Sequence, residues 1–232
     1  GLVYKDIKPE THFKTLDLLD ENSIFHKMKK QWYFVLDPHD RRPHCGIWGF
    51  INPLQKKYIA YEMFMEGTIS DLSAYIKSFE QFHKIPSSAV IRIGDPNKME
   101  TSTAVTGLRL KQEFAKYGLY FITKIDDDIT RGHLAVKETL SWNKMKPLDE
   151  FNSPALYFSE SVPKAKEMFR KYGYREWQSS SKEQKNPRET PKDLNKDFPD
   201  CVRYWIMSKP IYYQENDSTP ASYLNRTRTG YF

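Results

Sequence analysis

Three short runs of apolar and aromatic residues lie close together early in the chain, and their arrangement constrains the fold more than any other feature. WYFVLD (32–37), CGIWGFI (45–51) and KYIAYEMF (57–64) each have the length and the aromatic or β-branched content of a strand. The segment INPLQKK between the second and third runs carries the Asn and Pro of a turn. We therefore expect a three-stranded antiparallel meander.

Helix-like and strand-like patterns alternate after these runs. Thr68 or Ser70 can cap a helix in which apolar residues recur at helical spacing as far as Phe82. The later patterns predict, in chain order, a strand at 89–95, a helix at about 102–117, a strand at 119–125, a helix at 133–142, a strand at 155–159, and helices at 162–174 and 197–210. Because parallel strands need long and usually helical connections, this order predicts a mixed α/β sheet flanked by helices, antiparallel first and parallel afterwards.

The composition favours one basic domain that meets a polyanion. A chain of 232 residues can build one substantial core, and it has a formal net charge of +6 with 15% aromatic residues. This balance suits contact with nucleic acid, and a solvated lysine face would give it too. The two cysteines, Cys45 and Cys201, lack CxxC spacing, which argues against a disulfide framework or a zinc site and favours a reducing compartment. Neither a membrane span nor a signal peptide is expected.

Two of the predicted strands end on Asp-Pro. Asp37 closes the first run, in VLDPHD, and Asp95 closes the strand at 89–95, in RIGDPN. If these two strands lie side by side and parallel, both carboxylates reach the same edge of the sheet, where sites in open α/β sheets form. Asp200 lies near the start of the last predicted helix, in LNKDFPDCVRY, and this helix can bring its N-terminus to the same edge.

Three carboxylates at one edge repel one another unless a divalent cation holds them. Hard oxygen ligands select Mg²⁺ or Mn²⁺ over zinc, and a pair of such ions is the usual device for in-line displacement at phosphorus. We therefore expect Asp37, Asp95 and Asp200 to bind two ions and to hydrolyse a phosphodiester, with Asp37 bridging both ions. Taken singly, Asp-Pro is a common turn starter, and Asp197 with Asp200 can simply cap a helix. The joint pattern favours the site.

The motifs VLDPHD, RIGDPN and DFPDCVRYW, in this order, resemble the nuclease domain of phage terminase large subunits, the DNA-packaging motors of tailed bacteriophages. The segment ITRGHLAVKETL, the block PALYFSESVPKAKEMFRKYGYREW and the opening GLVYKDI extend the resemblance over nearly the whole chain. The resemblance implies a ribonuclease H-like fold. It also implies that the acids matching Asp37, Asp95 and Asp200 bind two divalent metals and cut duplex DNA.

The resemblance further implies a setting for this activity. The substrate would be concatemeric double-stranded phage DNA, cut during genome packaging in the cytoplasm of the infected bacterial host. The partners would be the terminase ATPase domain in the same full-length chain, the portal protein and the small terminase subunit. The sequence contains neither GxxxxGKS nor GxxxxGKT, so the ATPase motor is expected outside these 232 residues.

The expected organisation has three parts. Residues 1–30 are expected to be a linker from the ATPase domain, 31–210 the nuclease domain and 211–232 a C-terminal tail. The polar segment at 175–196 is expected to be a flexible loop, because it carries almost no apolar residues to bury.

Two features depart from the family pattern. Many members carry His three residues before the acid matching Asp200, where this chain has Asp197, so either acid is a candidate for the principal third ligand. The acidic run ending at Asp128 is also unusual. If the strand at 119–125 lies beside the strand at 89–95, Asp128 is close enough to contribute a ligand; the alternative is that this run is solvated and caps the following helix.

Basic residues around the acids are the candidates for DNA contact, because they would neutralise phosphates without reading bases. They are Arg41, Arg42, Lys98, Arg131, His133, Lys182 and Lys185. The three histidines near the motifs, His39, His44 and His133, are expected in ordinary surface roles. His133, expected in a loop close to the acids, is the best placed of them to touch phosphate or to position water.

Two other functions fit the same residues. Another ribonuclease H-like nuclease, such as a junction resolvase, would share the acids but not the block VPKAKEMFRKYGYREW. A non-catalytic module that docks on DNA or on the portal would use the acids only as turns and caps. Metal dependence separates both nucleases from the docking module, and preference for junctions over linear duplex separates the two nucleases.

Overall fold

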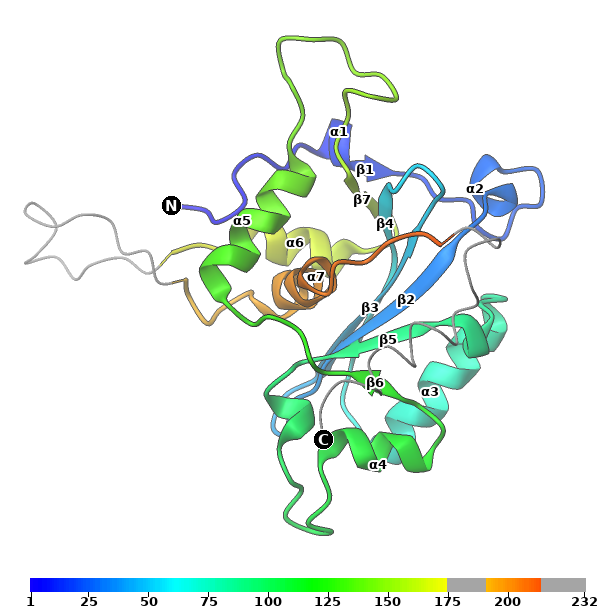
Figure 1. Ribbon diagram of the computed structural model, residues 1–232, viewed down its shortest axis with the longest axis vertical. Coiled ribbons are helices and arrows are strands. Elements are labelled where there is room, and N and C mark those ends of the chain that lie inside the picture. Colours follow the sequence, from blue (N-terminus) through cyan, green and yellow to red (C-terminus); the bar gives the residue numbers. More distant parts are fainter. Residues whose placement is uncertain (175–190, 214–232) are drawn as a thin grey trace, which may run out of the picture.

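The computed structural model describes residues 1–174 and 191–213, and these residues build one seven-stranded sheet flanked by helices (Figure 1). The strand order across the sheet is β1-β7-β4-β3-β2-β5-β6. The strands are β1 (Phe13–Lys14), β2 (Gln31–Asp37), β3 (His44–Ile51), β4 (Lys57–Met65), β5 (Ile91–Gly94), β6 (Phe121–Ile122) and β7 (Leu156–Ser159).

The pairing of the strands confirms the predicted mixed sheet. Strands β2, β3 and β4 form the expected antiparallel meander, and β5 and β6 then add in parallel beside β2. On the other side of the meander β7 pairs in parallel with β4, and β1 pairs in parallel with β7. The parallel neighbours of β2 and β4 are reached through helices, as such connections require.

The helices cover both faces of the sheet. They are α1 (Pro9–His12), α2 (Ile24–Lys27), α3 (Ile69–Phe82), α4 (Leu110–Lys116), α5 (Ile129–Leu140), α6 (Pro163–Lys171) and α7 (Asp197–Met207), with short 3-10 turns at Ser87–Ala89 and Lys98–Glu100. Helices α3 and α4 lie on one side of the sheet, whereas α5, α6 and α7 lie on the other (Figure 1). Thr68 caps α3, as one of the two predicted alternatives had it.

Alternation along β2 divides the core between the two faces. Tyr33 and Val35 belong to the apolar cluster beneath α5, α6 and α7. Phe34 and Leu36 belong to the separate cluster beneath α3 and α4. Since successive side chains of a strand point to opposite faces, Asp37 continues the Tyr33 and Val35 series toward α7. From Trp32 to Leu36 the strand carries only apolar and aromatic side chains, because both of its faces are buried there.

The helix and the strand predicted between residues 102 and 125 are both longer than the elements that form there. The helix predicted at about 102–117 begins only at Leu110, since residues 103–108 form a tight loop instead. In this loop the Thr103 N–H donates to the Leu108 carbonyl at 2.8 Å, and Gly107 adopts a left-handed backbone with φ of +70°. The predicted strand at 119–125 is reduced to Phe121–Ile122.

Residues 1–30, expected to be a linker, contribute to the sheet and its core. Phe13 and Lys14 pair with Phe158 and Ser159 of β7. Val3 and Tyr4 are buried. The Val3 N–H donates to the Tyr172 carbonyl at 3.0 Å, which ties this segment to the end of α6.

Part of the sequence-based expectations falls outside the described residues. The predicted flexible loop lies there for the most part, with Lys182 and Lys185, and so does the tail after residue 213. Within the described ranges, no helix combines the length and the apolarity needed to cross a membrane.

Candidate metal centre

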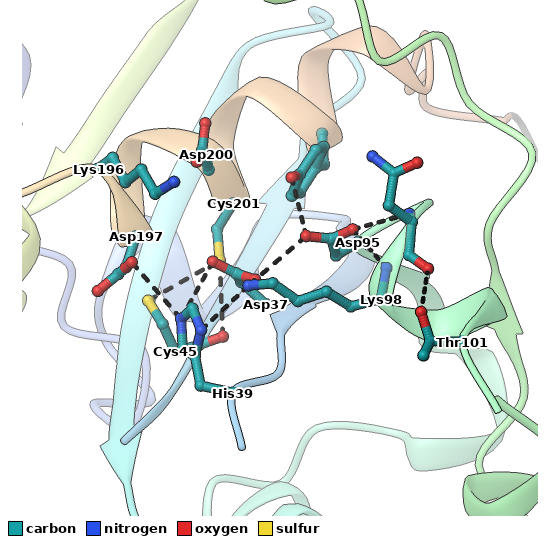
Figure 2. Close-up of polar contacts among 12 residues, drawn as sticks. Asp37, His39, Cys45, Asp95, Lys98, Thr101, Lys196, Asp197, Asp200 and Cys201 are labelled. Carbon is teal, nitrogen blue, oxygen red and sulfur yellow. Dashed lines mark hydrogen bonds and ion pairs between the residues drawn. The ribbon is translucent and has the colours of Figure 1, made fainter. Parts of the chain in front are cut away.

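The two strand-end carboxylates are brought together by the parallel pairing of β2 with β5. Leu36 is in register with Gly94, and the Asp95 N–H donates to the Leu36 carbonyl at 3.0 Å, which continues the ladder one step beyond the strand. Asp95 follows Ile93 by two positions and therefore faces α7, as Asp37 does. The predicted side-by-side placement of the two strands is confirmed (Figure 2).

Asp95 starts a turn and faces the site at the same time. Its Oδ1 accepts the backbone N–H groups of Asn97 at 2.8 Å and Lys98 at 2.9 Å, the side-chain-to-backbone pattern typical of aspartate in turns. Its Oδ2 accepts the Tyr204 hydroxyl of α7 at 3.0 Å. The two interpretations of the Asp-Pro motif are therefore compatible, because one oxygen organises the turn and the other faces the site.

Close packing fixes α7 over the meander. Trp205 is fully buried and lies on Gly49, where a Cβ would approach its ring to 2.5 Å, at the point where the register between β3 and β4 shifts. One turn earlier, the Cys201 thiol lies 3.6 Å from the Cys45 carbonyl and 3.9 Å from the Cys45 sulfur. This contact places the N-terminal turn of α7, with Asp197, above the end of β2.

A buried cluster forms where these elements meet. Asp37, His39 and Asp197 each offer a ligand atom, and the three atoms lie within 4.8 Å of one another. The His39 Nε2 is 3.3 Å from the Asp37 Oδ2 and 3.5 Å from the Asp197 Oδ1 (Figure 2). All three residues are at least nine-tenths buried. The expectation of a surface role for His39 is wrong, because its ring lies inside this cluster.

Two cations compensate the acids. The Arg42 Nη2 is 3.0 Å from the Asp197 Oδ1, and its Nε donates to the His39 Nδ1 at 3.1 Å. The Lys98 Nζ contacts the Asp37 Oδ1 and lies 3.7 Å from the Asp95 Oδ2. Each cation therefore neutralises a different part of the site: Arg42 pairs with the helix acid Asp197, and Lys98 lies between the two strand acids.

The pKa shifts follow from burial and from these partners. Burial raises the pKa of Asp37, but the nearby His39 ring and the Lys98 charge outweigh it, so that the pKa lies below its usual value. Burial lowers the pKa of His39, but the nearby carboxylates of Asp197 and Asp37 outweigh this effect and raise the pKa. The Asp37 carboxylate is therefore ionised at neutral pH although it is buried.

Unpaired atoms in this cluster show that its residues fit a divalent cation. Among the described residues, the His39 Nε2 and the Asp197 Oδ1 are buried without a hydrogen-bond partner. Their neighbours approach at 3.0 to 3.5 Å, but not in hydrogen-bond geometry. Buried polar atoms without a partner are costly, and a cation bound by the Asp197 Oδ1, and by the His39 Nε2 in its deprotonated form, would remove that cost. The two carboxylates suit Mg²⁺ or Mn²⁺, and the imidazole offers a further ligand atom.

Asp200 lies one turn further along α7 and makes a different set of contacts. Its Oδ1 accepts from the Arg203 Nε at 3.2 Å, and the Arg203 Nη1 lies 2.9 Å from the Asp127 Oδ1. Its carboxylate points away from Asp37 in Figure 2. Burial and the Asp37 charge raise the pKa of Asp200, against the lowering effect of Arg203, to about 6. The structure thus joins Asp37, Asp95 and Asp197 and leaves Asp200 beside this group.

The remaining predicted site residues on α5 have structural contacts. Asp128 accepts the Arg131 N–H at 2.7 Å as the cap of α5, in agreement with the capping alternative. The Arg131 guanidinium pairs with Asp126 at 2.9 Å. The expected surface role of His133 is wrong, because it lies in α5 and is buried against Tyr4 and Tyr172. Burial lowers its pKa to about 4.

A groove adjoins the cluster. It has a volume of about 790 Å³ and is bounded on one side by the turn after β2 and on the other by the segment that follows Lys98. Three of the predicted DNA-binding residues line it: Arg41, Arg42 and Lys98. The loop that replaces the predicted helix supplies Thr101, Ser102 and Thr103 on the opposite side. A cationic, hydroxyl-lined groove of this kind suits a phosphate chain.

The sequence alone did not predict that His39, Arg42 and Tyr204 contact the acids of the site. His39 lies two residues after Asp37, but only the turn that follows Pro38 directs its ring back to the carboxylates, and the hydrogen bond from its own N–H to the His44 Nδ1 at 3.0 Å helps to hold this turn. Arg42 pairs with Asp197 across 155 positions of sequence, and Tyr204 pairs with Asp95 across 109. Such contacts depend on where α7 docks.

Comparison with known proteins places this geometry in a known fold. No family model matches the sequence, and no curated protein is significantly similar to it. Among solved structures, the P22 large terminase nuclease domain superposes with a TM-score of 0.63, at 15% identity, over 90% of this chain and 92% of that chain. The fold is that of a large-terminase nuclease domain. The family resemblance carried by the three acidic motifs is confirmed at the level of the fold, which is ribonuclease H-like.

A longer structure superposes on the same region. The large terminase from the thermophilic bacteriophage D6E gives a TM-score of 0.61 at 16% identity over 90% of this chain. The chain spans 44% of the length of that terminase, less than half. The likeness therefore concerns the nuclease-like portion of such proteins.

Proposed function

We propose that this chain is a divalent-metal-dependent endonuclease domain that cuts concatemeric double-stranded phage DNA during genome packaging. The observation that carries the proposal is the buried group of Asp37, His39 and Asp197, with two unpartnered ligand atoms, at the carboxyl end of parallel strands. The superposition on terminase nuclease domains supports the same chemistry. A docking module would have no need for buried polar atoms that lack a hydrogen-bond partner.

The acids of β2, β5 and α7 are the proposed ligands. Asp37, Asp95 and Asp197 would hold two Mg²⁺ or Mn²⁺ ions, with the His39 Nε2 as a further donor. When bound, these ions supply an activated water and stabilise the leaving oxygen of the phosphodiester. The protein orients the carboxylates by the β2–β5 ladder and by the hydrogen bond from Tyr204 to Asp95. The role expected for Asp200 stays a prediction, and the geometry favours Asp197 as the third acid.

DNA would lie in the groove beside the acids. Arg41 and Arg42 come from the turn after β2, so that they stand next to the position where a scissile phosphate would meet the carboxylates. Binding through phosphates implies strong salt dependence and little sequence preference. Lys182 and Lys185 remain candidates outside the described residues.

The setting follows by analogy with the longer terminase. Structures of the D6E protein include complexes with ADP and with ATP-γ-S. We infer that this domain works in one polypeptide with an ATPase domain, in the cytoplasm of the infected host, together with the portal protein and the small terminase subunit.

Plasmid cleavage tests the proposal. Supercoiled plasmid is incubated with the purified chain in Mn²⁺, in Mg²⁺ and in EDTA, and nicked and linear products are measured. We expect cutting with metal, none in EDTA, and loss of cutting in Asp95→Asn. Asp17→Asn, at an exposed acid in the N-terminal segment, is the matched control and should cut normally. A folded protein that cuts under no condition, or equally well in EDTA, would contradict the proposal and favour the docking module.

A further inference from the structure

One side chain occupies the space between the two strand-end carboxylates. The Lys98 Nζ contacts the Asp37 Oδ1, lies 3.7 Å from the Asp95 Oδ2 and lies 3.0 Å from the His39 Nδ1 (Figure 2). The backbone directs it there, because the Lys98 N–H donates to the Asp95 Oδ1 at 2.9 Å and so fixes the start of the turn Lys98–Glu100. Lys98 and Asp95 therefore belong to the same turn after β5, and this turn presents both side chains to the site.

The charges of the site explain why a cation lies there. The side chains of Asp37 and Asp95 are 2% and 6% exposed, and they face each other from adjacent strands. Two carboxylates at this separation and burial repel strongly unless a positive charge lies between them. Arg42 pairs with Asp197 and His39 contacts Asp37, so that within the described part of the chain Lys98 is the side chain that forms ion pairs with both strand acids.

A divalent ion and the ammonium group compete for the same oxygens. Oxygen ligands bind Mg²⁺ at about 2.0–2.1 Å, in a nearly ideal octahedron. Such an ion between Asp37 and Asp95 would occupy the space where the Lys98 Nζ now lies, and two positive charges so close would repel. Binding of an ion between Asp37 and Asp95 therefore requires that Lys98 moves.

The groove beside the acids gives the Lys98 side chain room to move away from them. Its side chain is 38% exposed, on a flexible four-carbon stem, and it lines the 790 Å³ groove together with Arg41 and Thr101. A phosphate in that groove would give the ammonium group a new anionic partner. The same residue thus faces both the carboxylates and the space proposed for DNA.

We propose that Lys98 is a resident cation of the nuclease site: it stabilises the acids when no metal is bound, opposes metal entry, and moves to a DNA phosphate when substrate arrives. This inference rests on the proposed function and adds a mode of regulation to it. Metal and DNA then bind with positive coupling, so the metal centre is fully loaded only in the presence of substrate.

Mn²⁺ affinity of the metal-free protein tests the first part. Calorimetric titration should show Mn²⁺ binding to Lys98→Met about fivefold or more tightly than to the wild type, because a competing unit charge is gone. Lys116→Met removes a lysine that pairs with Glu113 on α4 at 2.8 Å, outside the groove lining, and should leave the affinity unchanged. Lys98→Gln serves if the Met variant does not fold. Equal or weaker binding by the Lys98 variant overturns the inference.

A second readout tests the coupling. Electron paramagnetic resonance of free Mn²⁺ measures binding whether or not DNA is cut, with duplex alone as the blank. A short duplex should raise the Mn²⁺ affinity of the wild type at least twofold more than that of Lys98→Met, and equal gains overturn the coupling. Failure of the proposed metal centre itself gives a different result. In that case Asp37→Asn binds Mn²⁺ as tightly as the wild type does, or neither the wild type nor Lys98→Met binds Mn²⁺.

Discussion

Two buried groups of charged side chains lie on opposite faces of the same strands, and they differ in whether their potential ligand atoms are hydrogen-bonded. On the α3 face, the Arg92 Nη2 of β5 lies 2.5 Å from the Glu80 Oε2, and the Trp48 Nε1 donates to the Glu80 Oε1 at 3.2 Å. Ser87 completes the partners of Glu80. On the α7 face, the group around Asp37 keeps two buried potential ligand atoms without a hydrogen-bond partner in the described residues, whereas the unpartnered atom of the Glu80–Arg92 pair is the Arg92 Nε, which carries a proton and cannot bind a metal.

The difference separates a structural role from a functional one. Arg92 and Asp95 are three positions apart on one strand and its extension, yet one carries a carboxylate partner in hydrogen-bond geometry and the other joins an incompletely paired site. A buried ion pair whose carboxylate oxygens are hydrogen-bonded holds its elements in place, and breaking it leaves an uncompensated charge. A group with unpaired ligand atoms retains the capacity to bind. The comparison predicts that substitutions on the two faces will affect different measurements.

The largest effect is expected on catalysis from Asp37→Asn. Loss of this ligand should lower plasmid cleavage by about a thousandfold or more, since metal stabilisation of the transition state is worth several kcal/mol. The free energy of unfolding, measured in urea, should change by only about 1 kcal/mol, because the substitution also relieves repulsion from Asp95. A large loss of stability with cleavage per folded molecule preserved would reverse the comparison.

Arg92→Met should act on stability instead. It leaves Glu80 buried with its strongest partner removed, and we expect a loss of about 3–5 kcal/mol of unfolding free energy, with cleavage per folded molecule largely retained. Arg109→Met is the matched control, because Arg109 makes an exposed ion pair with Glu100 at 2.9 Å. That control should cost less than about 1 kcal/mol. Equal losses in the two variants would mean that the Glu80 pair is not a structural element.

Metal should stabilise the chain only through the α7 face. At a Mn²⁺ concentration about 100 times its dissociation constant, the unfolding free energy should rise by about 2.7 kcal/mol. Differential scanning calorimetry should show this gain in the wild type and in Arg92→Met, and its absence in Asp37→Asn. A gain in Asp37→Asn would place the metal elsewhere.

Thr68→Ala should have the smallest effect. Thr68 caps α3, the helix that carries Glu80, and its hydroxyl accepts the Asp71 N–H at 3.2 Å while Asp71 accepts the Thr68 N–H in return. Loss of this cap should cost about 1 kcal/mol in a denaturant titration. Ser70→Ala, inside the helix and exposed, should be neutral or slightly stabilising. If Ser70→Ala lowered the free energy of unfolding more than Thr68→Ala does, Thr68 would not be the residue that caps α3.

The sequence predicted the sheet well where local pattern decides. The runs ending at Asp37 and Asp95 were expected as parallel neighbours, and β2 and β5 pair in that way. Two-residue strands such as Phe13–Lys14 carry no detectable pattern, because they exist only through their pairing with β7. The over-long helix prediction at 102–117 missed the left-handed turn at Gly107, which stops a helix from forming before Leu110.

The candidate site was predictable in part. Asp37 and Asp95 follow from strand ends, which a sequence displays. The choice between Asp197 and Asp200 depends on the rotation of α7, and this rotation is set by Trp205 against Gly49 and by Arg203 against Asp127. Both contacts join residues far apart in the chain. The roles of His39 and Lys98 were equally hidden from the sequence. His39 reaches the acids through the turn after β2, and Lys98 reaches them from the turn that follows the neighbouring strand β5.

The late position of α7 in the chain has a consequence for biosynthesis. Cys201 of α7 meets Cys45 of β3 across 156 positions, so this helix docks only after almost all of the described chain has left the ribosome. Contacts of such separation close loops of high entropic cost and form late in folding. A nascent chain can pair β2 with β5 and bring Asp37 to Asp95, but Asp197 is still missing. The order of synthesis therefore keeps unfinished chains from assembling the third acid of the site.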